Sequence, residues 1–320
     1  MMLRVLAVFA LLFSTLVQAA APSVLQRPIS LDTGNGTLYG SLLLPHSEQP
    51  PPVVLIIPGS GPTDRNGNSA GGAHTDNLRQ LALVLAKNRI ASVRYDKRGV
   101  AASRAATPDE RDLTVEGYVA DAVAWSRKLK ADPRFGPLIL LGHSEGALIA
   151  SLAAPASDAS AVISVAGSSR PVDEVFRAQL AGQVSPRDSE RALQILDNLK
   201  AGRTASNIPR ALQDVLRPSV QPYLISLFRQ DPAAAFAKLK MPALIIQGTH
   251  DVQVDVSHAE RLKAAKPDAE LALIPGMNHM LRIAPRAASQ QRDSYLNPQL
   301  PQASEVGLRI VDFIHRLPAA

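Results

Sequence analysis

The sequence predicts an α/β fold, with a mainly parallel sheet, helices on both faces and a helical insertion past the middle of the chain. Short apolar segments rich in β-branched residues alternate with longer segments of helical periodicity, a pattern typical of parallel sheets covered on both faces. The alternation stops once, between about residues 168 and 240, where helical patterns follow one another without a convincing strand. A chain of 320 residues, 46% of them hydrophobic, is long enough for one large domain of this kind.

The N-terminus is predicted to be a signal peptide spanning residues 1–19. Arg4 precedes an apolar run from Leu6 to Val17, and the small residues that begin at Ala19 suit cleavage after that residue. The run is shorter than the roughly 20 residues that cross a bilayer. We therefore expect export to the periplasm or the medium, with no stable membrane insertion after cleavage, and one domain over residues 20–320.

Composition excludes several classes of site. The chain contains no cysteine, so disulfides, thiolate metal sites and a cysteine nucleophile are ruled out. The net charge is +6, but the basic residues are scattered, which predicts a solvated surface and no nucleic-acid partner. In "GSGPTDRNG", Asp64 occupies the third glycine position of a dinucleotide motif, and no P-loop or metal-ligand spacing occurs. We expect no cofactor and no metal.

The first predicted element is a β-hairpin at the sheet edge, because Ile29–Pro45 has an Asn-Gly step between two strand-like arms. Buried strands are predicted at Val53–Gly59, Ala91–Gly99, Leu138–His143, Ala161–Gly167, Ala243–Asp251 and Glu270–His279. Helices are predicted at Asp76–Asn88, Val115–Lys130, Ala147–Leu152, Val256–Ala265 and Ser304–Arg316.

The insertion, Ser168–Lys240, is predicted to form a cap over one end of the sheet. An independent helical domain fits less well, because the strand pattern resumes immediately afterwards. Apolar residues at helical spacing predict three stripes: Val172, Phe176 and Leu180; Leu193, Leu196 and Leu199; Tyr223, Leu224, Leu227 and Phe228. These stripes either anchor the cap to the sheet or also line a pocket beneath it.

The stretch "LILLGHSEG" indicates a nucleophile. A buried strand ends at Leu141 and a helix begins near Glu145, so the turn between them has little room for side chains. Gly142 and Gly146 remove the side chains that would clash. Ser144 is then presented at the carboxyl end of a strand, where ligands bind in open α/β sheets. We predict that Ser144 is a nucleophile; without this context the pentapeptide would be a weak signal.

A serine hydroxyl needs a base, and the base needs an orienting acid. His279, in a glycine-containing loop after a strand, is the predicted base, and Asp251, just past the end of an earlier strand, is the predicted acid. Asp255 is the alternative acid, although it stands where a helix cap is expected. His143 adjoins the nucleophile but is expected to point away and brace a loop. His250 is expected to be structural, and surface positions are expected for His46, His74, His258 and His315.

The chain resembles α/β-hydrolases of the bacterial esterase and lipase type over roughly residues 29–317. "GHSEG", "PGSGPTDRNGN" and "YDKRG" resemble a subgroup of carboxylesterases with a helical cap, and the order Ser144, Asp251, His279 is that of the family. The resemblance implies the α/β-hydrolase fold and an oxyanion hole made by the backbone N–H groups of Glu145 and Ser60, with Gly61 as the alternative to Ser60.

Two departures from the family pattern weaken a closer assignment. Pro58 stands where many relatives have histidine, and Ala101-Ala102-Ser103 follows "YDKRGV" where glycine is common. Neither departure touches the three candidate catalytic residues. Asp96 and Arg98, inside "YDKRG", are expected to brace loops.

These residues predict an exported serine hydrolase that cleaves carboxylic esters with short acyl chains and takes a small-molecule substrate. A peptidase or amidase, a thioesterase and an acyltransferase would use the same residues, and fold alone does not choose among them. A non-catalytic ligand-binding relative is the alternative of another class, but such relatives typically lose a catalytic residue, and here all three positions are filled. No expectation for the oligomeric state follows from the sequence.

Overall fold

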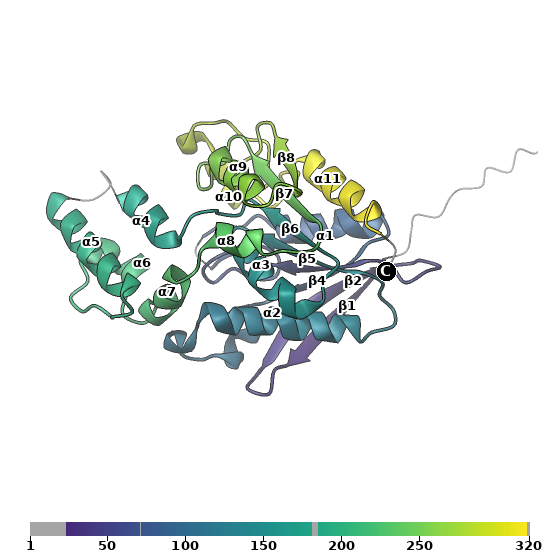
Figure 1. The fold of residues 1–320 in the computed structure, drawn as a ribbon, viewed down its shortest axis with the longest axis horizontal. Coiled ribbons are helices and arrows are strands. Elements are labelled where there is room, and N and C mark those ends of the chain that lie inside the picture. The colour runs from purple at the N-terminus through teal and green to yellow at the C-terminus, as the bar shows by residue number, and fades with distance from the viewer. Residues whose placement is uncertain (1–23, 71, 181–184, 319–320) are drawn as a thin grey trace, which may run out of the picture.

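The computed structural model describes residues 24–318 except 71 and 181–184, so the predicted signal peptide lies outside the described residues. In the described part, the strands form one eight-stranded sheet in the order β1-β2-β4-β3-β5-β6-β7-β8 (Figure 1). This is the predicted α/β architecture, with one antiparallel edge added to a parallel sheet.

The predicted hairpin forms that edge. β1 (Val24–Asp32) pairs antiparallel with β2 (Thr37–Pro45), and β2 pairs antiparallel with β4 (Ala91–Tyr95). The remaining pairs are parallel. They involve β3 (Val53–Ile57), β5 (Leu138–His143), β6 (Ala161–Val165), β7 (Ala243–Gly248) and β8 (Glu270–Ile274).

Two apolar cores form because strand side chains alternate between the faces of the sheet. In β3, Val53, Leu55 and Ile57 belong to one core, and Val54 and Ile56 belong to the other. The first core includes residues of α2 (Val115–Lys130), α3 (Glu145–Ser157) and α9 (Val256–Ala265). The second includes residues of α1 (Asn77–Lys87) and α11 (Ser304–His315). Both faces of the central strands are therefore covered, which explains why β3 is apolar throughout.

The predicted helical insertion lies between β6 and β7. Its helices are α4 (Val172–Leu180), α5 (Pro186–Lys200), α6 (Gln213–Leu216), α7 (Gln221–Phe228) and α8 (Pro232–Ala237). Figure 1 shows α4–α7 gathered beyond one end of the sheet, whereas α8 lies beside α3. The last helix of the insertion is thus packed onto the main body, where it contacts α3 and α9.

The cap is fastened to the loop after β4 and to α2. Glu110, in the short 3-10 helix Glu110–Asp112, pairs with Arg217 and accepts a hydrogen bond from Ser219 Oγ at 2.6 Å. Ser226 Oγ accepts from the Val115 backbone N–H at 2.9 Å, at the first residue of α2. These bonds hold the insertion against α2 and the loop that precedes it. A cavity remains between the cap and the carboxyl ends of the strands.

The apolar stripes of the cap are only partly as predicted. Leu196 and Leu199 are fully buried, but Leu193 is 39% exposed, so the prediction that all three share a buried face was wrong. With α-helical periodicity, positions 192, 195, 196 and 199 form the buried face, and Leu193 lies outside it. The side chain of Leu180 lies outside the described residues.

Several short elements were not predicted: α10 (Arg292–Leu296) and the 3-10 helices Ala101–Ala106, Arg210–Leu212 and Ala288–Gln290. Each is too short to show a periodicity. Among the described residues, no helix has both the length and the apolar character needed to cross a membrane.

Candidate active site

Ser144 lies at a sharp turn between β5 and α3, with φ 56° and ψ −123°. Its backbone N–H donates to the Val165 carbonyl at 2.9 Å, which holds this strained conformation in place. A Cβ at Gly142 would lie 2.0 Å from the Gly146 carbonyl oxygen, and a Cβ at Gly146 would lie 2.2 Å from the Ile57 carbonyl oxygen. The two glycines are therefore required by close backbone contacts, as the sequence predicted.

The structure brings Ser144, His279 and Asp251 into one hydrogen-bonded chain. His279 Nε2 lies 3.1 Å from Ser144 Oγ, and His279 Nδ1 lies 2.8 Å from Asp251 Oδ2. The three residues follow β5, β8 and β7, whose carboxyl ends meet at one edge of the sheet. Because Nδ1 faces a carboxylate, it carries the ring proton, and Nε2 is left as the acceptor for the serine hydroxyl.

Asp251 is held as a buried carboxylate by several donors. Oδ1 accepts from the backbone N–H groups of Gln253 and Val254 at 2.8 and 2.9 Å, and Oδ2 accepts from Gln247 Nε2 at 3.1 Å. Burial by itself raises the pKa of this carboxyl, but His279 and the two backbone amides outweigh that effect and leave the pKa below its usual range. The group is therefore charged at neutral pH and can orient His279.

Three residues near Asp251 in the sequence have supporting roles. Gln247 was missed by the sequence reasoning, although a glutamine inside an apolar strand is itself a signal that a buried partner needs a donor. Asp255 caps α9 by accepting from the Ser257 N–H at 2.8 Å, which confirms the predicted helix-cap role. His250 is structural as predicted, with Nδ1 2.7 Å from the Ala284 carbonyl oxygen.

His143 braces the loop that carries His279, which confirms its predicted role. Its Nε2 donates to the His279 carbonyl oxygen at 2.9 Å, and the two rings lie 5.0 Å apart. Burial, aided by the neighbouring His279, lowers the pKa of His143 to about 4. The ring is therefore neutral at neutral pH, which suits its position against a carbonyl and a second imidazole.

In the His143→Gln variant, the free energy of unfolding is expected to fall less than in wild type as the pH is lowered. In the unfolded chain His143 takes up a proton near pH 6.5, whereas in the folded protein it does so near pH 4. Its contribution to stability is complete above about pH 6.5 and is lost as the pH falls towards 4, by up to about 3 kcal/mol. Urea unfolding at several pH values measures this slope. Parallel losses in wild type and His143→Gln would contradict the assignment.

The backbone N–H groups of Ser60 and Glu145 are the oxyanion donors that the family resemblance implies. Ser60 and Glu145 line the cavity above Ser144, and neither N–H donates to another group in the part of the chain that the structure describes. The loop after β3 passes close to the serine, since a Cβ at Gly59 would lie 3.2 Å from Ser144 Cβ. Both amides are thus free to serve a ligand at Ser144.

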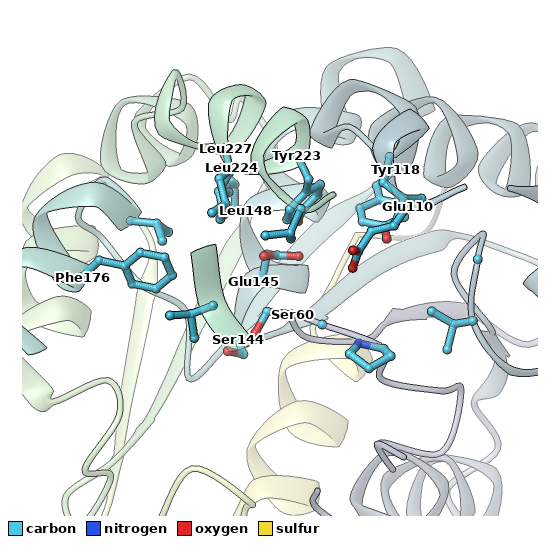
Figure 2. A pocket seen from close by; sticks show the side chains of 18 of the residues that line it. Ser60, Glu110, Tyr118, Ser144, Glu145, Leu148, Phe176, Tyr223, Leu224 and Leu227 are labelled. Atoms are coloured by element: carbon cyan, nitrogen blue, oxygen red, sulfur yellow. The ribbon is translucent and has the colours of Figure 1, made fainter. Parts of the chain in front are cut away.

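A cavity of about 710 Å³ lies between the carboxyl ends of the strands and the cap. Figure 2 shows Phe176 on one side of Ser144 and Glu145, and Tyr118 and Glu110 on the other. The apolar lining includes Leu148, Val172, Phe176, Leu224 and Leu227. Cap residues therefore line the pocket as well as anchoring the cap, and the volume is that of a site for a drug-sized molecule.

His258 lies at the cavity, whereas Asp96 and Arg98 support loops. His258 is 6% exposed and lines the cavity, with Nδ1 accepting from the Ser169 N–H at 3.0 Å, so the predicted surface position was wrong. Its place in the first turn of a helix gave no sign of what would pack over it. Asp96 accepts from the Arg65 and Ala102 backbone N–H groups, and Arg98 pairs with Asp121, which confirms the predicted loop-bracing roles.

No group of His, Asp or Glu side chains within the described residues is arranged to hold a metal ion.

Residues 53–290 match the sequence profile of the Alpha/beta hydrolase family. The chain belongs to this family. The match extends from the first residue of β3 past His279, so it includes every residue of the hydrogen-bonded chain and the whole cap.

This α/β hydrolase is similar to two curated relatives and shares its fold with a solved structure. Esterase EstD of Thermotoga maritima is 28% identical over 256 residues, 78% of this chain and 59% of EstD. Polyketide synthase ThaQ of Burkholderia thailandensis is 31% identical over 245 residues, 71% of this chain and 11% of ThaQ. The chain thus spans less than two thirds of either relative. Est1E of Butyrivibrio proteoclasticus, solved with ferulic acid bound, shares the fold with a TM-score of 0.60 at 17% identity, over 90% of this chain and 98% of Est1E.

Proposed function

We propose that this α/β hydrolase is a serine esterase that cleaves small carboxylic esters through an acyl-enzyme. The observation that carries the proposal is the hydrogen-bonded chain Ser144–His279–Asp251 at the base of a cavity. The similarity to EstD, whose name describes it as an esterase, supports an ester as the substrate.

Ser144, His279 and Asp251 have different roles in the proposed reaction. Ser144 Oγ attacks the ester carbonyl while its proton passes to His279 Nε2. The C–O bond to the leaving group then breaks, and the alcohol takes that proton. Water repeats the cycle on the acyl-enzyme, releasing the acid and restoring Ser144. Asp251 keeps the imidazole in the required tautomer and stabilises its charge.

The negative oxygen of the tetrahedral intermediate needs donors that are already in place. We propose the backbone N–H groups of Ser60 and Glu145, which border the cavity and have no other recorded hydrogen bond in the described chain. Glu145 begins α3, so its N–H also lies at the positive end of a helix dipole.

Short acyl esters, of roughly two to eight carbons, are expected to be the best substrates. Each added methylene gains about 0.8 kcal/mol by burial until the apolar side of the cavity is filled, and the gain then stops. The measurement is kcat/KM across a series of p-nitrophenyl esters. A maximum near sixteen carbons, or strong activation at an oil–water interface, would contradict this prediction and indicate a lipase.

Labelling with a fluorophosphonate tests the proposed reaction class. A phosphonylated peptide containing Ser144, together with ester hydrolysis that the label abolishes, would support the proposal. Labelling without hydrolysis of any ester in the series, but with cleavage of amides or thioesters, would indicate another type of serine hydrolase.

On the basis of the expected signal peptide, we further propose that residues 20–320 act outside the cytoplasm.

A further inference from the structure

Lys97 is a buried lysine next to the candidate active site, and the sequence gives it no obvious role. It lies in the loop after β4, with a relative exposure of 2%, although lysine is among the residues least often buried. β4 is paired with β3, so the loops after the two strands are neighbours. The Lys97 amine donates to the Gly59 carbonyl and lies 5.0 Å from the centre of the Tyr118 ring. No carboxylate in the described chain lies within ion-pairing distance of it.

The carbonyl that Lys97 contacts belongs to the same peptide group as the Ser60 N–H, the candidate oxyanion donor. The Gly59 C=O and the Ser60 N–H belong to one planar peptide group, and in a trans peptide they point in opposite directions. The described chain has no cis peptide bond. A group that holds the Gly59 oxygen on one side of the loop therefore holds the Ser60 N–H on the other side, and Ser60 lines the cavity.

This peptide has few other constraints. β3 ends at Ile57, so the Gly59–Ser60 peptide lies beyond the sheet ladder. Within the described chain, the Gly59 carbonyl accepts a hydrogen bond from Lys97 alone, and Gly59 has no side chain to restrict rotation. The next carbonyl, that of Ser60, accepts from Thr63 Oγ1 at 2.7 Å, which fixes the far side of the loop. Among the hydrogen bonds of the described chain, the one from Lys97 is therefore the one that restrains this peptide group.

We propose that Lys97 is a positioning residue, which aims the Ser60 N–H at the oxyanion by holding the Gly59 carbonyl. The inference rests on the proposed function, and it selects Ser60 over Gly61 as the second donor. Burial lowers the pKa of Lys97, and the carboxylate of Glu145 opposes this shift. The amine carries N–H groups in either protonation state, so the positioning does not depend on its charge.

Lys97→Met tests the proposal, because Met has a similar length and no donor. We expect kcat to fall by about 10- to 100-fold, less than the roughly 100- to 1000-fold effect of removing an oxyanion donor, because the Ser60 N–H is misaligned and not removed; KM is expected to change less than about threefold. The matched control is Lys266→Met, which removes another buried lysine, paired with Asp268 at 2.8 Å just after α9. Its kcat and KM are expected to equal those of wild type. Lys97→Arg, which keeps N–H donors, is expected to recover part of the lost kcat.

The rate of fluorophosphonate labelling provides a second readout that does not need an ester substrate, because the phosphoryl oxygen occupies the same oxyanion site. It is expected to fall in Lys97→Met in step with kcat. If wild type hydrolyses no ester, the proposed function fails, and the labelling rate still decides the role of Lys97.

Two results would overturn the role of Lys97. One is a Lys97→Met variant with a wild-type melting temperature whose kcat and labelling rate stay within about threefold of wild type. The other is a change confined to KM, which would indicate ground-state binding instead of positioning. If Lys97→Met does not fold, Lys97→Gln is measured in its place, since its amide is polar enough for the site but too short to reach Gly59. The changes expected for Lys97→Met, and the two results that would overturn the proposal, are the same for Lys97→Gln.

Discussion

The Ser144→Ala variant is expected to lose ester hydrolysis by about a millionfold in kcat, the loss seen when the nucleophile of a serine hydrolase is removed. Ser144 Oγ is the atom that attacks the substrate carbon in the proposed reaction, and it is the only hydroxyl that His279 Nε2 contacts in the described chain, at 3.1 Å. The variant is expected to fold normally, because the hydroxyl is partly exposed to the cavity.

Initial rates with a short p-nitrophenyl ester measure this effect, with thermal melting as the check on folding. Ser151→Ala is the matched control. It removes a hydroxyl from α3, the helix that follows Ser144, where Ser151 Oγ donates to the Ala147 carbonyl at 2.8 Å. The control is expected to keep wild-type kcat. Retention of a tenth of wild-type turnover by Ser144→Ala would refute the nucleophile assignment.

The second large effect is expected for Asp251→Asn, with a fall of about ten-thousandfold in kcat at neutral pH. Asn keeps the shape of the side chain but can donate a hydrogen bond to His279 Nδ1. The imidazole then shifts its proton to Nε2, where it can no longer accept the serine proton. The charge that stabilises the imidazolium is lost as well.

Asp255→Asn is the matched control for this variant and also tests the alternative acid. Asp255 caps α9 and accepts from the Ser257 N–H, which Asn can also do, so little change in activity or stability is expected. Steady-state kinetics on both variants at neutral pH separate the two carboxylates. A large loss in Asp255→Asn and a small one in Asp251→Asn would reverse the assignment.

Local features of the sequence were sufficient to predict most of the fold. β3 is short, apolar and rich in β-branched residues, β5 begins with four large apolar residues, and α2 and α9 begin and end at the predicted residues. The length of α3 was underestimated, because it continues through Pro155 to Ser157. A proline normally argues for a helix end, but α3 packs against α2, β5 and α8, and this packing outweighs the local preference.

The sequence by itself also determined the geometry of the turn after β5. The clash distances at Gly142 and Gly146 arise from backbone atoms a few residues away or on the next strand, so any chain with this turn must place glycine there. The serine between them was therefore recognisable from five letters and their strand-to-helix context. The helix-cap role of Asp255 was predicted correctly because a cap depends on local geometry, whereas the partner that His143 braces, the His279 carbonyl, lies 136 residues away in the sequence.

Only the tertiary structure decided which distant side chains share an environment. His258 of α9 accepts from the Ser169 N–H and lines the cavity, and Lys97 meets the Gly59 carbonyl across a sequence separation of 38 residues. Neither contact produces a periodicity, because each joins single residues from two segments that the fold makes neighbours. Sequence patterns report how one segment meets solvent or core, whereas the identity of the partner across the site is set by strand order and by the packing of the cap.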